Sequence, residues 1–98
     1  MFKVLFLCHG NICRSPMAEF ILKELVKKLK LEDDFIVSSA ATSQEEIGNG
    51  VYPPVKDLLR QKGIDCSAKR ARQVTVQDLK VFDYIIAMEQ FNLDNLYA

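Results

Sequence analysis

The sequence predicts a three-layer α/β/α fold whose parallel sheet has about three of its strands within this chain. Two short β-rich runs support this prediction, one over residues 2–7 and one over residues 35–37. Between them, residues 15–30 show the alternation of apolar and charged faces that is typical of a helix. Strand, helix and strand in this order form a βαβ unit, and its crossover connection makes the two strands parallel.

Composition indicates one small globular domain over residues 1–98, since 49% of the 98 residues are apolar. A formal net charge of zero argues against nucleic acid or an anionic membrane as the main partner. The first apolar run is too short for a membrane span or a secretory signal. The three cysteines are an odd number, which favours cytoplasmic thiols over disulfides. With His9 as the single histidine and no Cys-x2-Cys pair, we expect no metal and no other cofactor.

The first helix, residues 15–30, is expected to bury one apolar stripe against the sheet. Pro16 suits its first turn, where the missing N–H has no helical partner. The residues expected to face inward recur at helical spacing and are Ala18, Ile21, Leu22, Leu25 and Leu29.

Two further helices and a third strand are expected after a long irregular loop over residues 38–54. A short helix over residues 55–62 is closed by Gly63. Thr75 and Asp78 have the spacing of a capping box. The remaining expected features are the inward residues Val55, Leu58 and Leu59 of the short helix and an apolar strand over residues 84–88.

A last helical pattern begins at Glu89, with Leu93, Leu96 and Tyr97 on its apolar side. The sequence ends inside this pattern, so we expect a domain that is incomplete at its C-terminus.

The chemistry is concentrated in the loop between the first strand and the first helix, Cys8-His9-Gly10-Asn11-Ile12-Cys13-Arg14-Ser15. Such a loop lies at the carboxyl edge of a parallel sheet, where these folds bind ligands. Its backbone N–H groups can form an anion nest, and the helix dipole adds positive potential. We expect Gly10 and Asn11 to supply positive φ angles. The loop from Cys8 to Arg14 therefore predicts a phosphate-binding site.

Three side chains of this loop predict covalent catalysis. Cys8, favoured as a thiolate in this field, can attack phosphorus, and Arg14 can bind two phosphoryl oxygens. Ser15 can donate a hydrogen bond to the sulfur when the phospho-cysteine is hydrolysed. The alternative is a buried core cysteine and a surface arginine, because Cys-x5-Arg spacing is common by chance. The preceding strand, the Gly-Asn pair and the following Ser-Pro favour the catalytic interpretation.

Residues 8–19, CHGNICRSPMAE, resemble the signature of the low-molecular-weight protein tyrosine phosphatases. Residues 39–49, 71–75 and 82–88 resemble later segments of that family, in the same order. The resemblance implies a four-stranded parallel sheet, phosphotyrosine proteins or aryl phosphates as substrates, and inorganic phosphate as product. It also implies that Cys8 is the nucleophile, Arg14 the phosphate ligand and Ser15 the thiolate stabiliser, while Asn11 and Ser39 hold the loop in shape.

The sequence departs from this family in three places. The family's general acid is an aspartate of an Asp-Pro loop near the C-terminus, but this sequence has no Asp-Pro and lacks the last strand and helix. We therefore expect a catalytic fragment, or a missing part supplied separately. Glu45 stands where the family usually has an aromatic residue on the substrate rim, which favours basic flanking residues. Phe91 replaces a common serine and has no assigned role.

Other polar residues have alternative interpretations. In the family, cysteines matching Cys8 and Cys13 form a disulfide under peroxide, which implies redox regulation, and simple packing is the alternative for Cys13. Cys66 is expected to be an incidental thiol and His9 a plain loop residue. A basic cluster, expected to be solvated, comprises Lys69, Arg70 and Arg72.

Three alternatives to tyrosine phosphatase activity remain. Arginine phosphatases of the same fold carry threonine where Ile12 stands, and arsenate reductases need further cysteines, none of which follows Cys66. A non-enzymatic module would bind phosphate or phosphoprotein without turnover. The missing elements would also expose a sheet edge, which predicts a dimer or a complementing C-terminal fragment.

Overall fold

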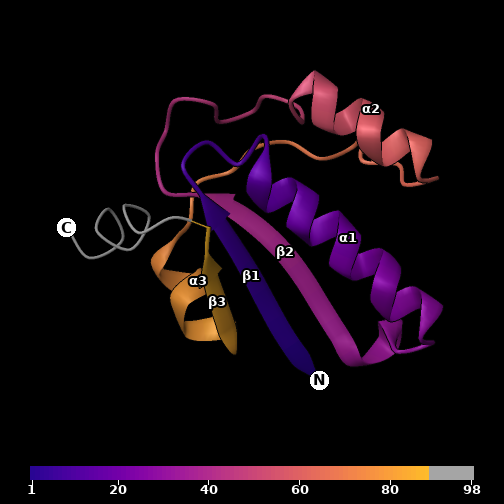
Figure 1. Cartoon of the computed structure of the whole chain (residues 1–98). Coiled ribbons are helices and arrows are strands. Elements are labelled where there is room, and N and C mark those ends of the chain that lie inside the picture. Colours follow the sequence, from indigo (N-terminus) through magenta and orange to yellow (C-terminus); the bar gives the residue numbers. More distant parts are fainter. Residues whose placement is uncertain (89–98) are drawn as a thin grey trace.

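Three parallel strands form the sheet, in the order β2-β1-β3 (Figure 1). They are β1 (Phe2–Cys8), β2 (Phe35–Ala41) and β3 (Tyr84–Ala87). Phe2 pairs with Phe35 and Cys8 with Ala41, while Leu7 pairs with Ala87 on the other side. The central strand β1 carries the most continuous apolar run, as expected for a strand that is covered on both faces. The predicted α/β class with a parallel sheet is confirmed.

The computed structural model describes residues 1–88, so the helical pattern predicted from Glu89, and Phe91 with it, lies outside the described residues. The helices are α1 (Arg14–Lys28), α2 (Pro53–Gln61) and α3 (Val76–Val81), with a short 3-10 turn at Glu32–Asp34. Within the described part of the chain, no helix is both long and apolar enough to cross a membrane.

The two faces of the sheet are covered by different parts of the chain. Val4 and Phe6 point to one face and pack, with Val37, against Ala18 and Leu22 of α1. Leu5 and Leu7 point to the other face, as the alternation along a strand requires. The residues that pack around them are Ala40, Val74, Phe82 and Ile85, two of which flank α3 in the sequence. α2 is joined to α1 through a further apolar cluster that contains Val55 and Leu59.

Helix α1 buries only part of the predicted line of residues, since Ala18 and Leu22 pack against the sheet as predicted. Ile21, Leu25 and Leu29 are 46%, 50% and 58% exposed, so their predicted inward position is wrong. The buried residues recur at helical spacing and include Ser15, Glu19 and Val26. The helix is turned toward these positions because Ser15 and Glu19 have hydrogen-bonding partners beneath the helix. It also ends earlier than predicted, before Lys30, which has a φ of 60°.

Two other predictions need correction. Residues 38–41, predicted as loop, continue β2, and Ala41 forms a further parallel bridge with Gln73. Leu58 is exposed, although Val55 and Leu59 of the same helix are buried as predicted. The capping box of α3 is confirmed, because the Thr75 side chain accepts from the Asp78 N–H and the Asp78 carboxylate accepts from the Thr75 N–H. Gly63 ends α2 with a φ of 78°, the conformation that favours glycine.

Candidate active site

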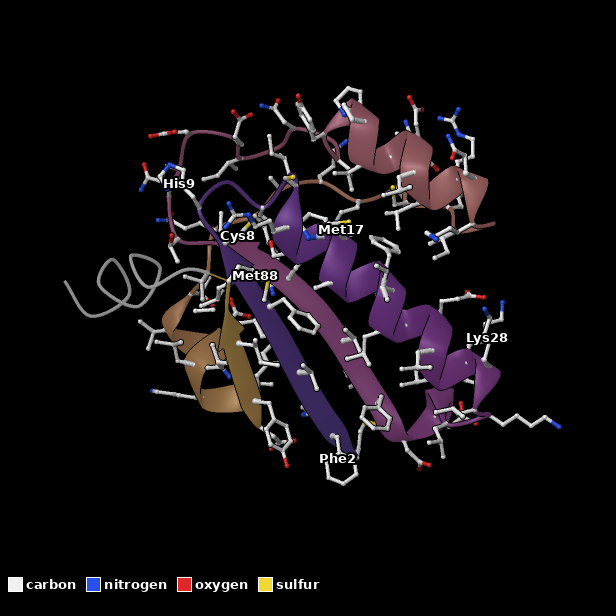
Figure 2. The ribbon with its side chains drawn as sticks, viewed as in Figure 1. Phe2, Cys8, His9, Met17, Lys28 and Met88 are labelled. Carbon is white, nitrogen blue, oxygen red and sulfur yellow. The ribbon has the colours of Figure 1, made fainter. Side chains whose placement is uncertain are left out.

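The candidate active site is a hollow at the carboxyl end of β1, where the chain turns into α1 (Figure 2). Its volume is about 250 Å³. Arg14, the first residue of α1, is exposed at its edge, and the N-terminus of the helix contributes a positive dipole end. The residues that line the hollow are Cys8, His9, Gly10, Ile12, Cys13 and Arg14. Six of the seven residues predicted to bind phosphate thus share one hollow.

The sulfur of Cys8 lies between two polar groups of the loop. Its Sγ is 2.9 Å from the Oγ of Ser15 and accepts a hydrogen bond of 3.2 Å from the backbone N–H of Asn11. Cys8 and Ser15 are both buried. The sequence predicted contact between Ser15 and Cys8, and the structure brings the two side chains together.

Asn11, the seventh predicted residue, lies beneath the loop and supports it. Its Nδ2 donates to Ser15 Oγ at 2.9 Å and to Ser39 Oγ at 2.8 Å. Its Oδ1 accepts from the backbone N–H of Arg72 at 3.1 Å. The buried amide thus uses both N–H groups and its oxygen, and a flipped amide would place N–H groups against the N–H of Arg72. Asn11 also has a φ of 57°, the left-handed conformation in which asparagine is favoured after glycine.

These contacts fix the direction of each hydroxyl proton. Because Ser15 Oγ accepts from Asn11, its own hydrogen can be donated to Cys8 Sγ. Because Ser39 Oγ also accepts from Asn11, its hydrogen is donated to the Glu19 carboxylate at 2.5 Å. The sulfur therefore faces two hydrogen-bond donors, the Ser15 hydroxyl and the Asn11 N–H.

Gly10 does not have the predicted positive φ, but a side chain there would be crowded. The residues with positive φ in the described part of the chain include Asn11 but not Gly10. A Cβ at Gly10 would instead meet the Cγ of Glu46 at 3.2 Å and Cγ1 of Ile12 at 3.7 Å. The glycine lets the loop pass closely under the side chain of Glu46.

A glutamate and a histidine side chain form a hydrogen bond at the rim of the hollow. Glu45, predicted on the substrate rim, places its Oε2 3.1 Å from the Nε2 of His9. His9 in turn accepts through its carbonyl oxygen from the N–H and hydroxyl of Ser43. Glu45 does not line the hollow itself, so it reaches the mouth through His9. His9, predicted as a plain loop residue, thus connects the phosphate loop to the segment over residues 43–46.

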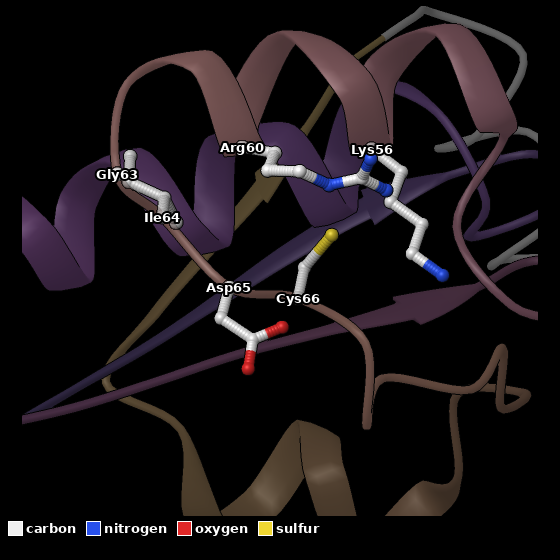
Figure 3. Close-up of a pocket in the computed structure, with 6 residues that line it drawn as sticks. All are labelled: Lys56, Arg60, Gly63, Ile64, Asp65 and Cys66. Carbon is white, nitrogen blue, oxygen red and sulfur yellow. The ribbon is translucent and has the colours of Figure 1, made fainter.

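The two other cysteines belong to an apolar cluster between α1 and α2. Cys66 is buried there with Val55 and Leu59, and Cys13 packs against the same cluster while also lining the hollow. All three cysteines are free thiols. A larger hollow of about 410 Å³ lies beside Cys66, lined also by Lys56, Arg60, Gly63, Ile64 and Asp65 (Figure 3). Burial raises the pKa of Cys66, which suits a packed thiol and not a nucleophile.

The basic cluster predicted to be solvated is largely part of the site's support. Lys69 is 10% exposed, donates to the carbonyl of Ser39 at 3.0 Å and lies 3.5 Å from Glu19 Oε1. Burial lowers the pKa of Lys69, and the facing Glu19 carboxylate opposes this shift. Arg72 forms an ion pair of 2.8 Å with Asp78, and only Arg70 is exposed as predicted.

Sequence reasoning missed this support because basic runs usually lie in solvent. The available signal was the helical spacing of Ser15 and Glu19, which places a carboxylate on the same line as a residue of the phosphate loop.

Comparisons with known proteins agree with this geometry. The sequence model of the family described as low molecular weight phosphotyrosine protein phosphatase matches residues 3–98. The low molecular weight protein-tyrosine-phosphatase YfkJ of Bacillus subtilis is 47% identical over 96 residues, which are 98% of this chain and 62% of that protein. The low molecular weight phosphotyrosine protein phosphatase of Homo sapiens is 44% identical over 93 residues, 95% of this chain and 58% of that protein.

Solved structures show the same similarity. The crystal structure of YfkJ superposes with a TM-score of 0.94, over 98% of this chain and 60% of that chain. The structure of DARP, described as a drosophila arginine phosphatase, is 43% identical with a TM-score of 0.91, again over 98% and 60%. The chain spans about three fifths of the length of the curated relatives named above.

Proposed function

We propose that the chain, because it belongs to the low molecular weight phosphotyrosine protein phosphatase family, hydrolyses phosphotyrosine monoesters through a phospho-cysteine on Cys8. The observation that carries this proposal is the placement of Cys8 Sγ between the Ser15 hydroxyl and the Asn11 N–H, inside a hollow that Arg14 borders. A thiolate held by two donors and facing an anion site is the arrangement that phosphoryl transfer to cysteine requires.

The reaction follows in two steps from these positions. In the first, Cys8 Sγ forms a bond to phosphorus while the bond from phosphorus to the tyrosine oxygen breaks, and the phenolate takes up a proton. In the second, water attacks phosphorus, the S–P bond breaks, and inorganic phosphate leaves. Arg14 and the loop N–H groups balance the charge on the phosphoryl oxygens in both steps. The Ser15 hydroxyl donates to the sulfur as it departs.

The proton for the leaving phenolate is the open part of this scheme. The family signature implies an aspartate in an Asp-Pro loop, and no Asp-Pro occurs in these 98 residues. A positioned general acid contributes about 10²–10⁴-fold. We therefore expect that p-nitrophenyl phosphate, whose leaving group barely needs a proton, is cleaved, whereas phenyl phosphate is cleaved slowly or not at all.

The experiment compares these two substrates on the full chain, with Cys8→Ser as the blank. Cleavage of both at similar rates would mean that another group within the chain supplies the proton. No turnover of either, and no trapped phospho-cysteine in the mass spectrum, would contradict the proposed function. Reversible phosphate binding that depends on Arg14 would then support the alternative of a phosphate-binding module.

A second candidate activity is hydrolysis of phosphoarginine. The similarity to DARP favours it, since that protein is described as an arginine phosphatase and shares the fold. Ile12 lines the hollow at the position where, by resemblance, arginine phosphatases carry threonine, and an apolar side chain there suits an aryl phosphate better. Paired peptides carrying phosphotyrosine or phosphoarginine test this directly. A higher kcat/KM on the phosphoarginine peptide would reverse the preference.

Redox regulation through Cys8 and Cys13 is a further proposal on this site. Both thiols border the same hollow, Cys8 buried and Cys13 partly buried. A disulfide between them would block the nucleophile and protect it from irreversible oxidation. Peroxide treatment should then cause an inactivation that dithiothreitol reverses, and Cys13→Ser should make it irreversible. Equal recovery of both proteins would argue against the disulfide.

We propose that a further element covers the outer edge of β3, either a second copy of the chain or a complementing C-terminal segment. Among residues 1–88 no strand pairs with that edge, and Tyr84 and Ile86 are 53% and 42% exposed there. Sedimentation that shows a monomer at every concentration would exclude the dimer.

We place the protein in the cytoplasm, since its proposed chemistry requires reduced thiols.

A further inference from the structure

We infer that Lys69 is a positioning residue for the phosphate loop, acting through Glu19, Ser39 and Asn11 on the Ser15 hydroxyl beside Cys8. Its effect on catalysis rests on the proposed function, whereas its effect on the geometry around Cys8 does not. None of these supporting groups lines the hollow, so Lys69 acts only through the residues that do.

Lys69 lies in an unusual place for a lysine. Its side chain is 10% exposed and that of Glu19 is 5% exposed, with 3.5 Å between Nζ and Oε1. The ammonium also donates to the carbonyl oxygen of Ser39 at 3.0 Å. A buried carboxylate is destabilising unless it is paired and hydrogen-bonded. Lys69 is one of two lysines that pair with the buried Glu19 carboxylate, and it is the more deeply buried of the two.

The position of the Glu19 side chain determines how the Ser39 hydroxyl is oriented. Glu19 Oε1 accepts the Ser39 hydroxyl proton at 2.5 Å, which leaves the Ser39 oxygen free to accept from Asn11 Nδ2 at 2.8 Å. With its first N–H held there, Asn11 directs the second to Ser15 Oγ. This orders the Ser15 hydroxyl as a donor to Cys8 Sγ. If Glu19 were displaced, the Ser39 hydroxyl would lose this acceptor and could turn toward another group.

The segment that carries Lys69 also contacts Asn11 directly, through the backbone of Arg72. Three residues further along, the backbone N–H of Arg72 donates to Asn11 Oδ1 at 3.1 Å, and its carbonyl accepts from Ala41 at 2.7 Å. Lys69 and Arg72 thus reach the same amide from opposite ends. Movement of Lys69 away from Glu19 would shift both contacts.

A second lysine on the same carboxylate provides the matched comparison. Lys23, one turn after Glu19 on α1, pairs with Oε2 and is 44% exposed. It touches neither Oε1 nor Ser39. Both lysines neutralise Glu19, but only Lys69 contacts the oxygen that orients Ser39. A comparison of Lys69→Met with Lys23→Met therefore separates the positioning of Ser39 from the neutralisation of the Glu19 charge.

The experiment measures two quantities on the full chain. The first is the rate of Cys8 alkylation by iodoacetamide against pH, followed by peptide mass spectrometry so that Cys13 and Cys66 are distinguished. The second is kcat and KM on p-nitrophenyl phosphate. For Lys69→Met we expect alkylation to reach half its maximum at higher pH, and kcat/KM to fall about 10- to 100-fold, mainly in kcat. Lys23→Met should stay within about 3-fold of wild type.

Two further variants keep the inference falsifiable if Lys69→Met folds poorly. Lys69→Arg should retain the wild-type pH profile, because a guanidinium can bind the same oxygens. Glu19→Gln combined with Lys69→Met should recover most of the lost activity, since glutamine still accepts from Ser39 without needing a cation. Melting curves identify any variant that is unfolded.

The inference is overturned if Lys69→Met keeps the wild-type alkylation profile, if Lys23→Met loses as much as Lys69→Met, or if the double variant is no better than Lys69→Met. A wild-type chain that does not hydrolyse p-nitrophenyl phosphate would contradict the proposed function only. The alkylation profiles would then still decide the role of Lys69.

Discussion

At the scale of single residues, the loop of the site is held by the hydrogen bonds of one buried amide, that of Asn11. Asn11 combines a left-handed backbone with an amide whose two N–H groups and oxygen are all bonded. No other residue type offers two donors and one acceptor at this distance from the backbone and also tolerates a positive φ. The shape of the phosphate loop is therefore set by one side chain beneath it.

Replacement of Asn11 by alanine should affect both stability and activity. The change leaves the partly buried Arg72 N–H without its acceptor and two buried hydroxyls without their donor, so the free energy of unfolding should fall by about 1–3 kcal/mol. Turnover of p-nitrophenyl phosphate should fall at least 10-fold, about the effect of a displaced catalytic group. Asn49→Ala, which removes an exposed asparagine bonded to Glu46, is the control and should change neither quantity appreciably.

Ser15→Ala should slow the second chemical step more than the first. Its hydroxyl lies 2.9 Å from Cys8 Sγ, and in the proposed mechanism it assists the departure of the sulfur. Phospho-cysteine should therefore accumulate, visible as a burst of p-nitrophenol followed by a slower steady state. Rapid-quench mass spectrometry measures the intermediate directly. A variant without a burst, whose two steps slow equally, would show that the serine acts on loop shape alone.

The exposed Glu45 beside His9 should influence which peptides are preferred. An acidic rim attracts basic flanking residues and repels acidic ones, so wild type should favour a phosphotyrosine peptide with lysine neighbours. For Glu45→Gln the preference should shrink by about 2- to 5-fold, the range of exposed charge interactions, and more so at low ionic strength. The ratio of kcat/KM on two matched peptides measures this. If this ratio were unchanged in Glu45→Gln at low salt, Glu45 would have no part in peptide preference.

At the scale of elements, local signals predicted local structure. The βαβ unit, the Thr75 capping box and the end of α2 at Gly63 follow from spacing within a few residues, and all three are present. The buried face of α1 was predicted only in part, because polar residues such as Ser15 and Glu19 lie on it. Glu19 can be buried because Ser39 of β2 and Lys69 pair with its carboxylate, and neither partner is close to it in the sequence. The loop that brings Cys8, Arg14 and Ser15 together could be predicted from the sequence, whereas the burial of Lys69 could not, since its contacts with Ser39 and Glu19 span 30 residues or more.

The cap of α3 should make stability depend on pH in the acid range. Burial alone would raise the pKa of Asp78, but hydrogen bonds from Arg72 and Thr75 outweigh it and lower that pKa below its ordinary value of 3.8. A carboxyl with a lowered folded-state pKa contributes stability that is present above pH 3.8 and is lost as pH falls through the folded value.

Comparison with Asp78→Asn measures this contribution. Near pH 7 the variant should be less stable by about 1 kcal/mol, typical of a weakened helix cap. The gap between wild type and variant should close as urea midpoints are measured at progressively lower pH below 3.8. A gap that stayed constant across this range would mean that the charge of Asp78 contributes nothing.

At the scale of the whole molecule, the central strand β1 packs on its two faces against different parts of the chain. Helix α1 covers one face of the sheet and is itself joined to α2 by an apolar cluster, while the other face is covered chiefly by the segment around α3. The site lies where these two layers meet at the end of β1, so it receives support from both. This explains why residues as distant as Asn11 and Arg72 converge there.

The contact between Asn11 and Arg72 also has a consequence for the order of events during synthesis. It joins residues 61 positions apart, and contacts of long separation form late in folding. A nascent chain that has not yet reached residue 72 carries the nucleophile but cannot complete the loop around it. We therefore expect Cys8 to gain its full reactivity only when the segment over residues 69–73 docks, so that its alkylation during synthesis would report when this segment packs against the sheet.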